Sequence, residues 1–257
     1  NSVPPELLSE MARAGCGGMF FGAESGSDET LKLVRKKVDA SRTLPAVRAC
    51  LSAGIQPTVS LMIGFREERA DQLNLTLELA LACAHQGRVN VDLHLVSLLP
   101  QTEMWHTHKD KLVLTDFALC CGDMGLGRTP TSEERDLVEK NPETFSSFYS
   151  LLPEHLDLHL LHAIRTGFSF VVVFRARTFL LIMERAQRSA LASFEELLAH
   201  CAGRFDFEAP FLAAHADDWD ATFYGFPGPE SDHWGSRTQR PPMQEFDDLY
   251  VEWARTI

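Results

Sequence analysis

Two segments of this chain share a pattern that limits what it can fold into. Residues 21–28 (FGAESGSD) and 61–68 (LMIGFREE) each run from an apolar stretch into a short polar turn and then into a helical stretch. A third apolar stretch, 89–99, ends at Pro100. Strands that alternate with helices in this way form βαβ units and predict an α/β fold, with a parallel sheet or part of a barrel. The turns after such strands are where α/β proteins bind ligands.

Residues that typically begin or end helices predict the bounds of the helices between these strands. Pro5 stands at the start of the first helix and Gly15 at its end, and Ser27 and Asp28 can cap the next one. We expect the strand at 18–23 to be buried on both faces, as parallel strands are. The predicted elements are helices at 6–15, 29–35, 41–53 and 69–85 and strands at 18–23, 58–63 and 89–99.

The pattern changes beyond Thr107. We expect an irregular stretch at 115–130 and mainly helical stretches at 132–152, 157–187 and 189–201. Residues 168–174 (FSFVVVF) carry β-branched side chains that favour a strand, but their neighbourhood predicts a helix. The predicted domains are therefore 1–112, a mainly helical extension at 113–224, and a Pro/Gly-rich acidic tail at 225–257 with a short terminal helix.

The overall charge restricts the partners. The chain has 257 residues and a formal net charge of −12, which argues against nucleic acid as a direct partner. No apolar run approaches the roughly 20 residues needed to span a bilayer, so we expect no membrane partner. The six cysteines include no CxxC pair, which favours reduced structural thiols and a cytoplasmic protein. No leader precedes Pro4 and the first residue is Asn1, so we expect a piece of a longer chain without a signal peptide.

The turn after the first strand holds the first candidate site. Glu24 and Ser25 stand there between Gly22 and Gly26, and glycines let a ligand approach the backbone closely. Glu24 and Ser25 could hydrogen-bond to hydroxyl or amino groups. The alternative is a helix-capping turn with a glycine bend and no ligand.

Histidines provide weaker candidates. Asp92 and His94 share one face of the third strand, where they could face a barrel interior. His155, His159 and His162 have i, i+4, i+7 spacing, which could hold a metal but lacks an HExxH core, so a polar helix face is the favoured interpretation. We therefore predict no metal ligand in this chain.

The motifs, taken in order, resemble a known family. The set formed by residues 14–16, 21–27, Leu31, Lys36, residues 53–55 and 62–64, and Glu68 resembles the second half of the core of radical S-adenosylmethionine (SAM) enzymes, over residues 5–110. This resemblance implies the C-terminal half of a partial (β/α)6 TIM-like barrel, followed by the mainly helical extension. The family begins with a CxxxCxxC loop that holds a 4Fe–4S cluster. This chain has no such loop, so the cluster ligands are expected outside it.

The resemblance also implies the residues that bind SAM. Glu24 and Ser25 correspond to the segment that touches the ribose and methionyl groups. Lys36 is the expected partner of the SAM carboxylate, which needs a cation in a closed barrel. The alternative for Lys36 is a solvated helix end, and its neighbours Arg35 and Lys37 compete for the role.

Two further turns belong to the implied SAM site, and both depart from the family. Gly64 lies in a turn that resembles Gly-Phe-Pro-Gly-Glu-Thr but carries Arg66 and Glu67 in place of Pro and Gly. Pro100 and Thr102 resemble the Pro-Gly-Thr turn near the adenine, with Gln101 in place of Gly. The implied cofactor-binding residues are Glu24, Ser25, Lys36, Gly64, Pro100 and Thr102, and no catalytic residue is assigned.

A segment of the C-terminal extension resembles one subfamily of these enzymes. Residues 141–149 (NPETFSSFY) resemble radical SAM proteins that carry an N-terminal cobalamin-binding domain. The resemblance implies an enzyme that cleaves SAM at the cluster and abstracts a hydrogen atom from its substrate, with cobalamin-dependent methyl transfer as one possible outcome. It also implies a small-molecule or peptide substrate, the upstream half-barrel of the same protein, and a reductase such as flavodoxin or ferredoxin. The fragment alone is expected to be inactive.

Two alternatives stay open. A different α/β-barrel enzyme would need a basic or Gly-rich anion site at the strand ends, which the sequence does not offer. A degenerate barrel that serves as a non-catalytic binding or scaffold module is favoured by the altered turn at Arg66 and Glu67 and by the missing cluster cysteines.

Overall fold

The computed structural model describes residues 4–121, 129–205, 207 and 241–257. The described elements up to residue 95 are α1 (Pro5–Arg13), β1 (Gly18–Glu24), α2 (Asp28–Leu33), α3 (Thr43–Ser52), β2 (Gln56–Ile63), α4 (Ala70–Ala84) and β3 (Asn90–Leu95). They confirm each predicted helix and strand of this region. β3 ends at Leu95, earlier than the predicted end at residue 99. Its pairing with β2 stops at the pair Ile63–Leu95, and one further hydrogen bond joins the Val96 N–H to the Ile63 carbonyl.

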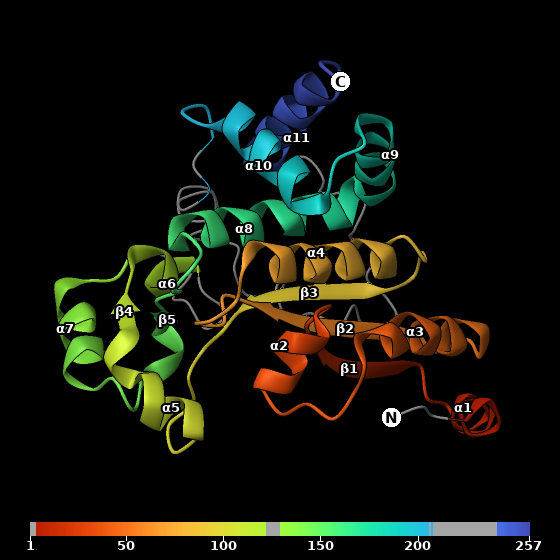
Figure 1. Ribbon diagram of the computed structural model, residues 1–257, viewed down its shortest axis with the longest axis horizontal. Helices are drawn as coiled ribbons and strands as arrows, with labels where there is room; N and C mark the ends of the chain where they lie inside the picture. The colour runs from red at the N-terminus through yellow and green to blue at the C-terminus, as the bar shows by residue number, and fades with distance from the viewer. Residues whose placement is uncertain (1–3, 122–128, 206, 208–240) are drawn as a thin grey trace. The chain divides into compact units, whose positions relative to one another are not determined.

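The three strands form one parallel sheet in the order β1-β2-β3. Figure 1 shows the strands side by side with α4 next to β3. This sheet confirms the predicted α/β class. The partial barrel stays a prediction.

The two faces of β2 differ in burial. Val59, Leu61 and Ile63 are fully buried and form the centre of the core, whereas Thr58 and Met62 on the opposite face are half-buried. Alternation of this kind follows from the two-residue period of a strand.

The expectation that β1 is buried on both faces is wrong. The Phe20 side chain is 66% exposed and Gly18 is exposed as well. The reason is its position, because β1 pairs only with β2 among the described strands and therefore forms an edge of the sheet.

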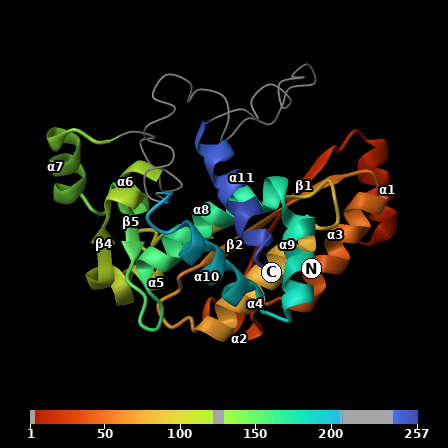
Figure 2. The same cartoon turned by 90° about the horizontal axis from the view of Figure 1, so that it is seen from above.

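The chain divides into two compact units. The first contains residues 1–96 and 153–195, and therefore the sheet together with α8 (Leu158–Phe174), α9 (Ala176–Ala186) and the start of α10 (Ala190–Cys201). α9 lies beside α4, as both views indicate (Figures 1 and 2).

The ambiguous run at 168–174 lies in α8, so the predicted helix is confirmed. Its apolar side chains are needed for packing: the rings of Phe168 and Phe179 lie 6.1 and 4.6 Å from that of Phe194. Burial of this aromatic cluster outweighs the strand preference of the valines.

Within the described part of the chain, no single helix has the length and apolar composition needed to cross a membrane. α8 and α9 meet that test only as a pair, Leu158–Val172 with Ala176–Ala186, and the pair is bent by 112°.

The second unit contains residues 97–152 and 196–257. Its first part holds α5 (Glu103–His108), β4 (Leu112–Leu114), α6 (Asp116–Cys121), α7 (Ser132–Lys140) and β5 (Tyr149–Leu151), and β4 and β5 pair in antiparallel fashion. The second part holds the end of α10 and α11 (Pro241–Ala254), which covers the predicted terminal helix.

Two predictions for this unit are wrong. Residues 116–121 form a helix, because Thr115 accepts a hydrogen bond from the Ala118 N–H and the side chains of Phe117 and Leu119 are buried. Residues 149–151 form a strand, because pairing with β4 overrides the local helical preference. The predicted domain bounds stay predictions, and residues 225–240 lie outside the described residues.

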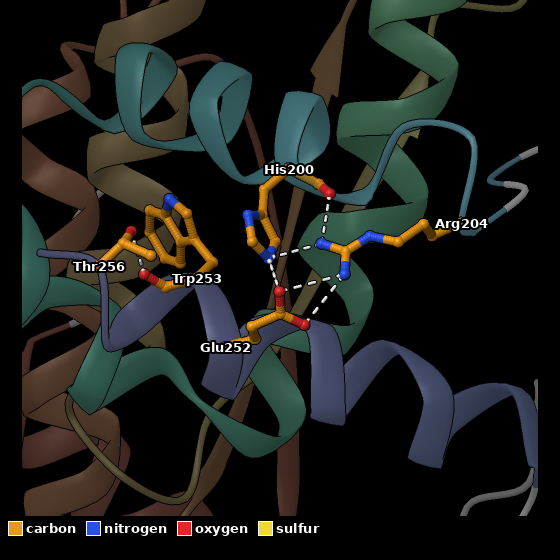
Figure 3. A network of polar contacts seen from close by, with 5 residues as sticks. All are labelled: His200, Arg204, Glu252, Trp253 and Thr256. Atoms are coloured by element: carbon orange, nitrogen blue, oxygen red, sulfur yellow. Dashed lines mark hydrogen bonds and ion pairs between the residues drawn. The ribbon is translucent and has the colours of Figure 1, made fainter.

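A network of polar contacts joins α11 to the end of α10 (Figure 3). Arg204 donates to the Glu252 carboxylate at 3.0 Å and to the His200 carbonyl at 2.9 Å. Exposed ion pairs of this kind contribute little to stability, whereas the Tyr250 and Trp253 side chains of α11 are buried.

One contact in the first unit is unusually close. Gly26 follows β1 and lies directly against α4, where a Cβ added at Gly26 would stand 2.2 Å from the Leu75 carbonyl oxygen. No side chain fits at this position without displacing the helix backbone.

We predict that Gly26→Ala lowers the free energy of unfolding by about 3 kcal/mol, the upper end of the usual cost of overpacking. Gly17→Ala is the control, because a Cβ there meets nothing within 4 Å, and its effect should stay within about 0.5 kcal/mol. Urea unfolding of the full-length protein measures both. Equal stability of the two variants would contradict the close packing of Gly26.

Candidate functional site

The tip of β1 departs from regular strand geometry. Glu24, its last residue, has φ of +66°, and the pairing of β1 with β2 shifts between Gly22 and Glu24. A non-glycine residue with such a φ is strained, and a bulge re-aims the side chain that follows it. Strain of this kind gathers at functional sites, which makes the β1 tip the first candidate.

Glu24 forms an ion pair with Lys36 at this tip. Their Oε1 and Nζ atoms are 2.6 Å apart, and the side chains are 20% and 33% exposed. A Cβ added at Gly22 would stand 2.6 Å from Glu24 Oε1 and 3.2 Å from Lys36 Nζ, so a larger residue there would displace the ends of these two side chains. The structure therefore brings together two of the predicted site residues, Glu24 and Lys36.

The end of α2 directs Lys36 toward Glu24. Arg35 takes a left-handed conformation after the helix, and the Lys36 N–H bonds back to the Leu31 carbonyl at 2.8 Å. Lys36 pairs with Glu24 and is half-buried, while its neighbours Arg35 and Lys37 are exposed. The solvated helix end, considered as the alternative for Lys36, is therefore not what the structure shows.

Ser25 has a different environment from Glu24. Its side chain is fully buried, its Oγ lies 2.9 Å from Thr76 Oγ1, and it accepts a hydrogen bond from the Ser27 N–H. Ser27 accepts from the Thr30 N–H and is the N-cap of α2, as predicted. The Ser25 hydroxyl thus links the β1 tip to α4, and its role as a SAM contact stays a prediction.

The tip of β2 contains Gly64, the fourth predicted site residue of this unit. Gly64 has φ of +85°, and a Cβ there would stand 3.1 Å from Leu161 of α8. Its N–H donates to Glu68 Oε2 at 2.7 Å. We call residues 64–68 the β2-tip turn.

Glu68 belongs to the turn that carries the family resemblance, and its surroundings in the structure make it a functional candidate that was not among the predicted site residues. The side chain is 1% exposed, and burial raises the pKa of its carboxyl group to about 7, against the opposing effect of the Gly64 and Phe65 N–H groups. The sequence shows Glu68 as a residue of the family-like turn and as an acidic residue before a helix, which is ordinary at an exposed position. No sequence signal distinguishes the buried from the exposed case.

Pro100 and Thr102 belong to the second unit. Thr102 is the N-cap of α5, since its Oγ1 accepts from the Trp105 N–H and donates to the Leu99 carbonyl at 2.7 Å. Gln101 between them has φ of +66°. Their role near the adenine of SAM stays a prediction.

The expected helix face of three histidines is wrong. α8 begins at Leu158, so only His159 and His162 lie on it, with ring centroids 6.2 Å apart, and His155 precedes it. Burial, with smaller contributions from His159 and Arg165, lowers the pKa of His162 to about 4, which keeps that ring neutral. Asp92 and His94 lie on one face of β3, opposite Ser60 and Met62 of β2.

The described thiols are free and mostly buried. Burial raises the pKa of Cys83 to about 12 and that of Cys201 to about 11, so neither is a reactive thiolate. Among the residues that the structure describes, no group of three or more His, Cys, Asp or Glu side chains is arranged to hold a metal ion.

Comparison with known proteins adds to this geometry. Residues 1–80 match the Radical SAM superfamily. Over 80 residues, the chain is 26% identical to a protein of Pyrococcus horikoshii named an uncharacterized methyltransferase. The match covers 31% of this chain and 17% of that relative. The superfamily match includes the β1 tip and the β2-tip turn, and it supports a radical SAM type of function for an enzyme.

We predict that Ser25→Ala lowers the free energy of unfolding by about 1–3 kcal/mol, because Thr76 and the Ser27 N–H both lose a buried partner. Ser9→Ala, at an exposed position on α1, is the control and should change it by less than about 0.5 kcal/mol. Denaturant unfolding of the full-length variants provides the measurement. An unchanged stability of Ser25→Ala would mean that this hydroxyl is not required by the fold.

Proposed function

We propose that this chain is the SAM-facing half of a radical SAM enzyme, with the β1 tip as the part that holds SAM. The observation that carries this proposal is the strained Glu24, paired with Lys36 above Gly22, within the stretch that matches the superfamily. A half-buried carboxylate beside an ammonium group offers a hydrogen-bond acceptor and a donor side by side. That combination suits a ligand that carries an amino group and a carboxylate of its own.

In this proposal each residue has a defined task. Glu24 accepts hydrogen bonds from the hydroxyl or amino groups of SAM, and Lys36 donates to its carboxylate. The backbone at Gly22 lets the ligand approach closely, and the β2-tip turn with Gly64 closes the neighbouring side of the site. Ser25, Pro100 and Thr102 remain proposed contacts from the family resemblance.

The 4Fe–4S cluster is the group that supplies the electron for SAM cleavage in this family. The residues of this chain do not fit it: the sequence lacks a CxxxCxxC loop, and the described thiols Cys50, Cys83 and Cys201 are buried and separate. We therefore propose that the cluster ligands belong to an upstream half-barrel of the same protein. A reductase such as flavodoxin or ferredoxin is the proposed electron donor.

Methyl transfer is the reaction outcome that we propose to test first. It is supported by the name of the Pyrococcus horikoshii relative, which is 26% identical to this chain over 80 residues. Cobalamin, held by a further upstream domain, and a small-molecule or peptide substrate belong to the same proposal. The free thiols support a cytoplasmic setting.

A non-catalytic binding or scaffold module is the alternative. One observation favours it: Glu24 and Lys36 satisfy each other, and the Ser25 hydroxyl is used within the fold, so the turn is stable without a ligand. The two proposals differ in whether SAM binds and is consumed.

Electron paramagnetic resonance of the full-length protein, reconstituted anaerobically with iron and sulfide and then reduced, separates them. A 4Fe–4S signal that shifts on addition of SAM, together with 5′-deoxyadenosine or S-adenosylhomocysteine as product, supports the enzyme. Absence of a cluster signal and of SAM binding supports the scaffold.

A second prediction concerns the ion pair. Lys36→Met should weaken SAM binding by about 10- to 100-fold, the usual effect of losing one charge-assisted hydrogen bond. Lys37→Met removes the same charge one residue away at an exposed position and should change the Kd less than about twofold. Isothermal titration calorimetry of the full-length protein measures both. Equal effects of the two variants would exclude a specific role for Lys36.

A further inference from the structure

The β2-tip turn is closed over a carboxyl group that is only partly satisfied. Glu68 Oε2 accepts the Gly64 N–H at 2.7 Å. Glu68 Oε1 is buried and has no hydrogen-bond partner within the described part of the protein. A buried polar atom without a partner is rare in proteins and calls for a physical explanation.

The protonation state of Glu68 provides that explanation. Removing one carboxyl oxygen from water without a hydrogen-bond partner costs much more for the ionised carboxylate than for the neutral acid. Burial is the largest influence on this group, and it raises the pKa to about 7, with the N–H groups of Gly64 and Phe65 opposing it. Near neutral pH the closed turn therefore contains both forms.

Other charged groups lie on the turn and on the elements around it, but none of them is among the causes of the raised pKa of Glu68. On its own segment Arg69 pairs with Glu29 of α2 and with Asp71, and the Arg66 carbonyl accepts from the Glu154 N–H. The titratable groups of the turn and of the facing elements are Arg66, Glu67, Arg69 and Asp71, then Glu29 of α2, Glu154, and His159, His162 and Arg165 of α8. Leu161, the α8 residue nearest Gly64, is apolar and fully buried.

We propose that Glu68 is a positioning residue that holds the β2-tip turn closed in its neutral form and lets the turn open when it is ionised. The side chain acts through the Gly64 N–H and not on a ligand directly. The turn stands beside the β1 tip, because Glu24 is in register with Leu61 of β2, three residues before Gly64. The link from this turn to SAM rests on the proposed function, while the behaviour of the turn does not.

The direction of the effect follows from proton linkage. In the open turn Glu68 is in water and titrates near its ordinary value, so the closed turn binds the proton more tightly. Raising the pH from about 5 to about 7 therefore favours opening by roughly tenfold per pH unit, and the effect levels off above about pH 7.

Amide hydrogen exchange of the full-length protein, followed by mass spectrometry between pH 5 and pH 8, tests the proposal. Glu68→Gln is isosteric with the neutral acid and keeps an oxygen for the Gly64 N–H. Relative to this variant, the wild-type peptide covering residues 61–69 should lose protection by roughly tenfold per pH unit between pH 5 and 7. Glu67→Gln removes a charge from the same turn and should keep the wild-type pH dependence.

A parallel pH dependence in wild type and Glu68→Gln would overturn the proposal. If Glu68→Gln fails to fold, the wild-type protein still tests it, because after correction for intrinsic exchange the 61–69 peptide should respond to pH and the β3 peptide, residues 90–95, should not. Equal responses of the two peptides would also overturn it.

SAM binding provides the second measurement. Any loss of SAM affinity in the wild-type protein should occur between pH 5 and 7 and level off above about pH 7, and the affinity of Glu68→Gln should stay constant. A protein whose exchange follows Glu68 but which does not bind SAM at any pH would retain the positioning role and refute the proposed function. A SAM affinity with the same pH dependence in both proteins would refute the coupling of the turn to SAM.

Discussion

The contact between Gly26 and the backbone of α4 is the constraint on which the site depends. With a Cβ position only 2.2 Å from the Leu75 carbonyl oxygen, the chain leaving β1 lies directly on the helix that follows β2. The hydrogen bonds of Thr76 with Ser25 and Gly26 fix the same approach. Backbone packing therefore holds the β1 tip against α4. This contact fixes the positions from which the side chains of the β1 tip project.

Two acidic residues on this frame have opposite surroundings. Glu24 is half-buried and its charge is balanced by the Lys36 ammonium group. Glu68 is closed off from water, and backbone N–H groups are its partners. The first arrangement presents charge to a ligand, and the second makes the conformation of a turn depend on charge. Both follow from where the strand ends place the side chains and not from the residue type.

The sequence was sufficient for the elements that repeat a local pattern. The parallel strands and their helices could be predicted because apolar runs, glycines and the Ser27 cap act locally. β5 and α6 could not, because pairing with β4 and burial of Phe117 decide them through distant contacts. The Glu24–Lys36 pair and the burial of Glu68 likewise depend on a bulge and on a neighbouring helix, which no spacing in the sequence records.

Backbone strain distinguishes the site from ordinary turns. Four non-glycine residues of the described chain have positive φ: Glu24, Arg35, Gln101 and Gln187. Arg35 and Gln187 follow helices, where a left-handed residue satisfies the last carbonyl groups, and Gln101 precedes the cap of α5. The positive φ of Glu24 has no comparable explanation, because Glu24 ends a strand and does not flank a helix. The pairing of this strand with β2 shifts between Gly22 and Glu24. Strain at a strand end without a local cause is typical of functional sites and therefore supports the proposed SAM site, whereas the pairing of Glu24 with Lys36 alone does not distinguish a ligand site from a scaffold.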